Sequence, residues 1–105
     1  MRMSGLGLLL LFPLGQAAVG EEVRVAIRGG GFEPAAIVAR KGDVLVLKNE
    51  DSVERNVFSP SRGMAFDWGN QKPGEERRQK LGAAGVFDIE DVFAVEKSMR
   101  LEVLP

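Results

Sequence analysis

Hydrophobic and polar residues alternate in short runs along most of this chain. In the run 22–28 the apolar residues occupy every second position. This period of two predicts a β-strand with one buried face. The run 44–49 is apolar on both faces, which predicts a central strand that is covered from both sides.

Further strands are expected over 37–39 and 53–59, and the run 85–103 is expected to form two strands joined by a tight polar loop. The segment 66–74 combines two large aromatic residues with strong turn formers and predicts a loop. The segment 75–81 is rich in charge and is compatible with either a strand or one helical turn.

No stretch after the first twenty residues has a sustained helical period, and Gly, Pro and Asp separate the runs. Six to eight short strands of this kind predict an all-β antiparallel sandwich or barrel. The triplet Gly29–Gly31 is interpreted as a turn. A phosphate-binding loop would need a helix directly after it, and Pro34 opposes one.

The first twenty residues have the layout of a secretory signal peptide. A basic start at Arg2 precedes an apolar stretch over 6–14 and small residues over 16–20. We therefore expect a signal peptide over 1–20 and one domain over 21–105. An uncleaved membrane tether and a buried N-terminal element are the alternatives, but the apolar stretch is too short for a stable membrane span.

Charge and composition exclude several classes of function. The chain of 105 residues has a net charge of −1, so it lacks the basic surface that nucleic acid binding requires. It contains no Cys and no His. This excludes thiol redox chemistry, iron–sulfur clusters and cysteine zinc sites.

An ordered set of short motifs resembles a known family. The motifs are Phe32-x-Pro34, Lys41-Gly42-Asp43-Val44, Lys48-Asn49-x-Asp51, Asn56-Val57-Phe58-Ser59, Phe66-Asp67-x-Gly69-x-Gln71-Lys72-Pro73-Gly74, Gly85-Val86-Phe87 and Met99-Arg100-Leu101-x-Val103. In this order they are similar to cupredoxins of the plastocyanin and amicyanin type, and most of all to small exported proteins called methylamine-utilisation-like. The resemblance implies a Greek-key β-sandwich that holds one copper ion for electron transfer.

The copper ligands of that family are two His, one Cys thiolate and a distant Met. The first His directly precedes the Asn-Val-Phe-Ser motif, and Arg55 stands there in this chain. Counting back from Met99 through the family's Cys-x-x-His-x-x-Met loop places Glu96 at the second His and Phe93 at the Cys. The segment 85–93 is longer than the family spacing.

Without His and Cys, no alignment of this chain supplies a blue-copper site. Met64 and Met99 are thioether ligands for Cu(I), but they lack a third soft ligand. We therefore expect no metal and no cofactor, although the family cofactor is copper.

Two hypotheses describe the altered copper site. In the first, Arg55 and Glu96 form a salt bridge across it and Phe93 fills the space of the thiolate. In the second, both charged side chains extend into water and contribute little. Phe93 is expected to pack, and Met99 fits an apolar strand face better than a ligand position.

Other candidate residues have two interpretations each. Trp68 either caps the core or stands exposed as a contact residue. Asn56 is expected to tie the two ligand loops together, as in the family. Asp88, Glu90 and Asp91 are assigned to a solvated strand face, with an acid–base hydrolase as the alternative.

The expected function is that of an exported, metal-free, non-enzymatic binding or accessory module. Its partner would be a periplasmic redox enzyme, a cytochrome or an assembly machine, contacted through Arg55, Trp68 and Glu96. The alternative is a copper electron-transfer protein of the plastocyanin type that takes ligands from another chain. A small hydrolase that uses the acidic strand is the third possibility.

Overall fold

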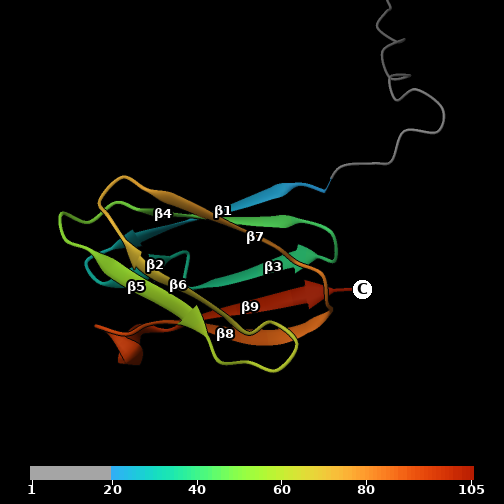
Figure 1. The fold of residues 1–105 in the computed structure, drawn as a ribbon. Helices are drawn as coiled ribbons and strands as arrows, with labels where there is room; N and C mark the ends of the chain where they lie inside the picture. Colours follow the sequence, from blue (N-terminus) through green and yellow to red (C-terminus); the bar gives the residue numbers. More distant parts are fainter. Residues whose placement is uncertain (1–19) are drawn as a thin grey trace, which may run out of the picture.

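The computed structural model describes residues 20–105 as a β-sandwich of two layers (Figure 1). The first sheet has the strand order β2-β1-β4-β7 and the second has the order β3-β9-β8-β5-β6. The strands of the first sheet are β1 (Glu22–Arg28), β2 (Gly31–Glu33), β4 (Val44–Asn49) and β7 (Glu76–Lys80). Those of the second are β3 (Ala36–Arg40), β5 (Arg55–Ser59), β6 (Phe66–Gln71), β8 (Gly85–Asp91) and β9 (Met99–Leu104).

The structure confirms the predicted all-β sandwich and differs from the prediction in two details. The described residues form nine strands rather than six to eight. The sheets are also mixed, because β1 pairs with β4 and β3 pairs with β9 in parallel. The chain reaches these parallel neighbours through connections that cross between the layers, which gives it room to return in the same direction.

The core lies between the two sheets and is built by the alternation along each strand. Val25 and Ile27 of β1 point inward, as do Leu101 and Val103 of β9. Strand β4 lies inside its sheet, between β1 and β7, and its central residues 45–47 have no solvent exposure. The prediction of a central strand that is covered on both faces is therefore confirmed.

The segment 66–74 differs from its prediction, because residues 66–71 form strand β6 at the edge of the second sheet. Its partner is β5, with a register shift between Asn56 and Phe58. Phe66 and Trp68 pack against the core and stack on each other with ring centroids 4.5 Å apart. Their burial stabilises a strand in a segment whose turn residues favour a loop.

The run 85–103 forms two paired strands, as predicted. Strands β8 and β9 pair from Gly85 with Val103 to Ile89 with Met99. The loop between them contains a short 3-10 helix, η2 (Val95–Lys97). This loop returns the chain at the end of the sandwich that lies away from the C-terminus (Figure 1).

The predicted signal peptide falls almost entirely on residues 1–19, which lie outside the described residues. The division of the chain at residue 20 therefore stays a prediction. Over residues 20–105 no helix is long and apolar enough to cross a membrane.

Candidate functional site at one end of the sandwich

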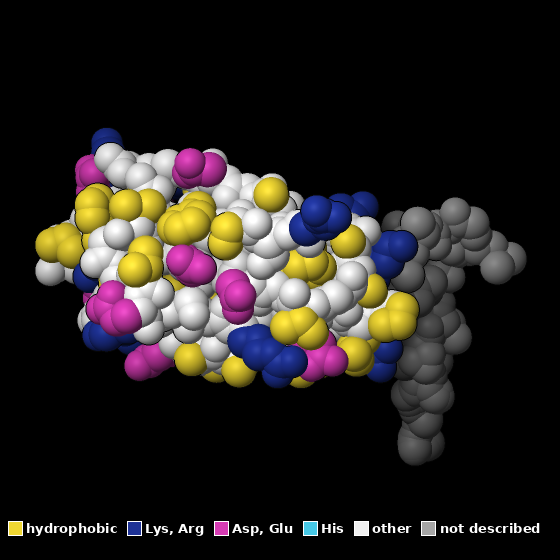
Figure 2. Space-filling model, turned by 90° about the horizontal axis from the view of Figure 1, so that it is seen from below, with side chains coloured by type: hydrophobic (Ala, Val, Ile, Leu, Met, Phe, Trp, Pro, Cys, Tyr) yellow, Lys and Arg dark blue, Asp and Glu magenta, His cyan; other side chains and the backbone are white. Residues whose placement is uncertain are grey.

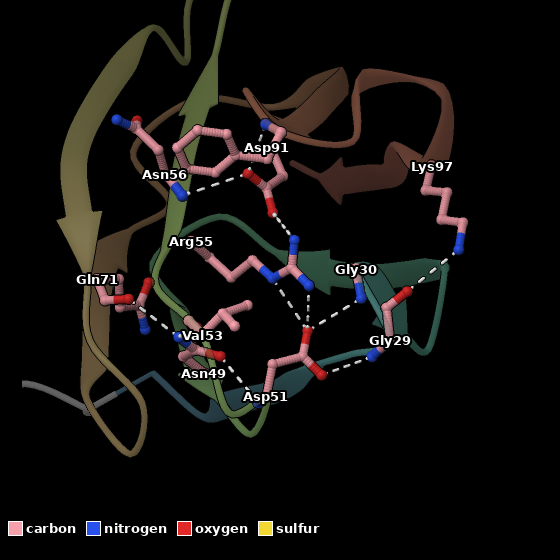
Figure 3. Close-up of polar contacts among 11 residues, drawn as sticks. Gly29, Gly30, Asn49, Asp51, Val53, Arg55, Asn56, Gln71, Asp91 and Lys97 are labelled. Carbon is pink, nitrogen blue, oxygen red and sulfur yellow. Dashed lines mark hydrogen bonds and ion pairs between the residues drawn. The ribbon is translucent and has the colours of Figure 1, made fainter.

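Three turns meet at one end of the sandwich, which we call the loop end. They are the glycine turn 29–30, the turn 50–54 between β4 and β5, and the loop 92–98 between β8 and β9. Lys97 Nζ donates a hydrogen bond to the Gly29 carbonyl at 3.1 Å, which joins the first turn to the third. Figure 3 shows the side chains that fill the space between these turns.

Arg55 is at the centre of this end and lies between two carboxylates. Its Nε and Nη2 atoms are each 3.0 Å from Oδ2 of Asp51. Its Nη1 atom is 3.6 Å from Oδ2 of Asp91. The exposed fractions of the three side chains are 15% for Arg55, 13% for Asp51 and 0% for Asp91. Because the group is shielded from water, these charges interact more strongly than an exposed pair would.

Asp51 also accepts two hydrogen bonds from the glycine turn. The Gly29 N–H lies 2.6 Å from Oδ1 and the Gly30 N–H lies 2.9 Å from Oδ2. Burial alone would raise the pKa of Asp51. The two glycine N–H groups and the nearby guanidinium outweigh burial and hold that pKa below its usual value. Asp51 is therefore a well-stabilised anion.

The glycine turn has a specific reason for its composition. Gly29 and Gly30 both have positive φ, at 59° and 76°, and this directs their N–H groups at one carboxylate. A Cβ atom on Gly30 would lie 3.5 Å from Nη2 of Arg55. The sequence predicted a plain turn here, and the structure shows a turn that binds a carboxylate of its own chain.

Asp91 is the last residue of β8, and its two oxygens have different partners. Oδ1 accepts hydrogen bonds from the backbone N–H of Phe93 at 3.0 Å and of Asn56 at 3.3 Å. Oδ2 is buried and has no hydrogen-bond donor within the described chain. Within residues 20–105, the only cation that forms an ion pair with this oxygen is Arg55.

A second polar layer supports the site from below. The Asn49 Nδ2 atom donates to the carbonyls of Val53 and Gln71, each at 2.9 Å, and its Oδ1 accepts from the Asp51 N–H at 2.9 Å. Gln71 in turn donates to the Leu47 carbonyl at 3.0 Å. Asn49 and Gln71 are both fully buried, so these bonds fix the turn that carries Asp51.

The hypothesis that pairs Arg55 with Glu96 is wrong. Arg55 pairs with Asp51 and Asp91 within residues 20–105, and Glu96 is an exposed residue of η2. Asp51 lies on the turn directly before Arg55, and Asp91 ends the neighbouring strand β8. Both carboxylates are therefore within ion-pair distance of the guanidinium. Glu96 instead belongs to the outer part of the loop 92–98.

Phe93 also differs from its prediction. Its exposed fraction is 62%, so it does not pack in the place of a thiolate. The inward-facing residue at the end of β8 is Asp91, two positions earlier. Strand alternation offers a signal for this, because Phe87, Ile89 and Asp91 share the buried face of β8. The assignment of Asp91 to a solvated face is therefore wrong, whereas Asp88 is exposed as expected.

The structure also places three further residues for which the sequence predicted a role. Met99 is fully buried in the core, which confirms its interpretation as a core residue. Trp68 is half-buried against the core and lies along β6 rather than in a loop. Asn56 does link β5 to the end of β8, but through its backbone, since its carbonyl accepts from the Val92 N–H at 2.8 Å. Its side chain bonds to Asn70.

The loop end also exposes apolar side chains. The exposed fractions are 52% for Val92, 62% for Phe93 and 53% for Val95, and Val53 on the neighbouring turn is 51% exposed. We call these four residues the apolar patch. Figure 2 shows hydrophobic side chains at this end of the molecule, interspersed with charged ones. Sequence reasoning missed the patch because it assigned Phe93 to the interior.

The donor atoms at the loop end do not fit copper. A blue-copper site needs imidazole nitrogens and a thiolate, and the sequence has neither. The central group is a guanidinium, which is a permanent cation without an acceptor. Across residues 20–105 no group of three or more His, Cys, Asp or Glu side chains is arranged to hold a metal ion. The arrangement can neutralise buried carboxylates and present an apolar surface.

No known protein-family model matches the sequence. No curated protein matches it either. Solved structures do match the fold. A novel purple cupredoxin from Nitrosopumilus maritimus superposes with a TM-score of 0.68 at 17% identity, over 76% of this chain and 97% of that one. A Cu(I) structure of an amicyanin variant gives a TM-score of 0.72 at 18% identity, over 88% and 90%.

A copper-containing nitrite reductase from Thermus scotoductus SA-01 gives a TM-score of 0.75 at 17% identity. The match covers 90% of this chain but only 25% of the reductase, so the likeness concerns one part of that protein. The structure therefore has the cupredoxin fold, as the sequence motifs suggested.

Proposed function

We propose that this protein is an exported, metal-free cupredoxin-like module that works by binding a protein partner through the loop end. A periplasmic redox enzyme, a cytochrome or an assembly machine is the class of partner proposed. Export rests on the sequence pattern of residues 1–20. The module itself catalyses no reaction under this proposal.

One observation carries the proposal: the loop end exposes the apolar patch to solvent, while Arg55 neutralises the carboxylates of Asp51 and Asp91 in its interior. A fold that holds copper in some proteins here encloses Arg55 between Asp51 and Asp91. Electron transfer through copper would require ligands from another chain, because this sequence contains no His and no Cys.

The apolar patch supports contact with a protein. Val92, Phe93 and Val95 lie within four consecutive residues, and each exposes more than half of its surface. Phe is enriched in the centres of protein interfaces because its ring buries a large apolar area at low entropic cost. Trp68 is a weaker contact candidate than the sequence suggested, since its ring is half-buried against Phe66.

Arg55 is also a weaker contact candidate, because both carboxylates already engage its guanidinium. Glu96 remains a candidate, since it is exposed beside Val95. The proposed contact surface is therefore the apolar patch together with Glu96.

The test is a capture experiment from periplasmic extract with the mature domain as bait. A patch variant, Val92→Ser/Phe93→Ser, should lose the captured partner. A matched control, Val38→Ser/Val86→Ser, changes two valines with similar exposure, 58% and 53%, on the strands β3 and β8. The control should retain the partner. Equal capture by both variants, or equal loss, would show that the patch is not the contact surface.

A further inference from the structure

We infer that the guanidinium of Arg55 is a buried cation that cross-links the segments of the loop end. In other proteins a bound metal ion has this role. Arg55 joins the turn 50–54, the glycine turn and the end of β8 through Asp51 and Asp91. This inference does not rest on the partner-binding proposal, because it concerns the interior of the loop end and not its surface.

Sequence distance shows how much the guanidinium joins. Arg55 opens β5, and Asp51 lies four residues before it, on the preceding turn. Asp91 ends β8, which pairs with β5 at Val57. Through Asp51 the same cation reaches the glycine turn that follows β1. A single side chain therefore connects both sheets of the sandwich.

Burial determines which contacts depend on the cation. Asp51 has two backbone N–H donors in addition to Arg55. Within residues 20–105, Asp91 has two donors on Oδ1, but its buried Oδ2 faces only the guanidinium. Removing Arg55 would leave that oxygen buried and uncompensated, which is the costly case for a buried ion pair. Removing both charges would relieve much of this loss.

Shape explains why an arginine suits this place. Its planar fork presents several N–H groups in different directions, so one side chain can serve two carboxylates. Nε and Nη2 face Asp51 while Nη1 faces Asp91. Gly30 lies beside this fork, since a Cβ atom there would be in ordinary van der Waals contact with Nη2 at 3.5 Å.

The cation also makes the loop end unsuitable for a metal ion. A copper ion in this position would stand beside a permanent positive charge and would have only hard carboxylate ligands. The side chains of Arg55, Asp51 and Asp91 therefore make this cupredoxin fold unsuitable for copper. The same end is held together without metal.

The experiment is a double-mutant cycle on the unfolding equilibrium of the mature domain in urea. Arg55→Met and Asp91→Asn should each raise the unfolding constant by about tenfold or more, and the coupling factor between them should exceed about fivefold. The matched control is Arg24→Met with Glu76→Gln. This is an ion pair at 3.2 Å whose side chains are 55% and 35% exposed, and it should couple by a factor below about two.

A local readout separates a cross-link from a general stabilising contact. Amide hydrogen exchange at Gly30 and Phe93 should speed up about tenfold or more in Arg55→Met under native conditions, while amides of β9 stay slow. Arg55→Lys keeps the charge but not the fork, so it should restore only part of the protection. A coupling factor within about twofold of one, or unchanged exchange at both amides, would overturn the inference. If Arg55→Met fails to fold, the same exchange measurement is made on Arg55→Lys. Unchanged exchange at the amides of Gly30 and Phe93 in that variant would then overturn the inference.

Discussion

Oδ2 of Asp91 lies 3.6 Å from Nη1 of Arg55 and has no hydrogen-bond donor within residues 20–105. The Asp91 side chain is completely buried, so water does not compensate its charge. Burying a carboxylate is costly unless hydrogen-bond donors or a cation compensate its charge. Under the inference drawn above, this ion pair holds the loop end together without metal.

Stability should depend on pH through Asp51. Its pKa is held below the usual value, so the folded state binds a proton less readily than the unfolded state. The stability that Asp51 contributes is therefore present above its unfolded pKa of about 3.9 and is lost as the pH falls through its folded pKa. Urea unfolding at a series of pH values should show that Asp51→Asn is most destabilising near neutral pH. A destabilisation that stays constant down to about pH 2 would contradict this assignment.

Asn49→Ala should be strongly destabilising. The substitution removes the donor of two hydrogen bonds and the acceptor of a third, all on a fully buried side chain. The expected loss is on the order of 3 kcal/mol, since buried partners are left unsatisfied. Asn70→Ala is the control, because Asn70 is exposed and should lose less than about 1 kcal/mol. Equal losses in thermal or urea unfolding would refute the buried polar layer.

Met99 should act through packing alone. Met99→Ala creates a cavity in the core and should lower the free energy of unfolding by about 2–5 kcal/mol. Met99→Leu keeps the volume and should cost less than about 1.5 kcal/mol. Urea denaturation of both variants measures the difference. A Met99→Leu protein as unstable as Met99→Ala would indicate that the thioether itself matters.

Phe93→Ser should leave stability nearly unchanged. The side chain is 62% exposed, so the free energy of unfolding should change by only about 0.5 kcal/mol. Under the proposed function the same variant should weaken capture of the partner. A loss of more than about 2 kcal/mol in urea unfolding would mean that Phe93 packs in the interior after all.

Much of the fold follows from residue pattern. The strict alternation of 22–28 predicts a strand with one buried face, the two apolar faces of 44–49 predict a central strand that is covered on both sides, and both are observed. The segment 66–71 forms a strand although its turn residues predict a loop, because pairing with β5 and packing of Trp68 stabilise the strand there. Tertiary packing outweighed local preference in that segment.

The site was less predictable, and Asp91 shows why. Counting residues back from Met99 led to Phe93, because counting assumes a loop of fixed length. Alternation along β8 leads instead to Asp91, but a charged residue at an inward position contradicts ordinary composition rules. Its burial becomes understandable only with Arg55 beside it, and that proximity depends on pairing between strands that are distant in sequence.

A copper titration of the refolded, metal-free mature domain with Cu(I) and Cu(II) tests whether the loop end is held together without metal. Binding is measured by calorimetry and by visible absorbance. We expect no stoichiometric complex and no thiolate-to-copper absorbance, because the loop end already contains the Arg55 cation and the chain lacks His and Cys. A one-to-one complex with a dissociation constant below about 1 μM would contradict it.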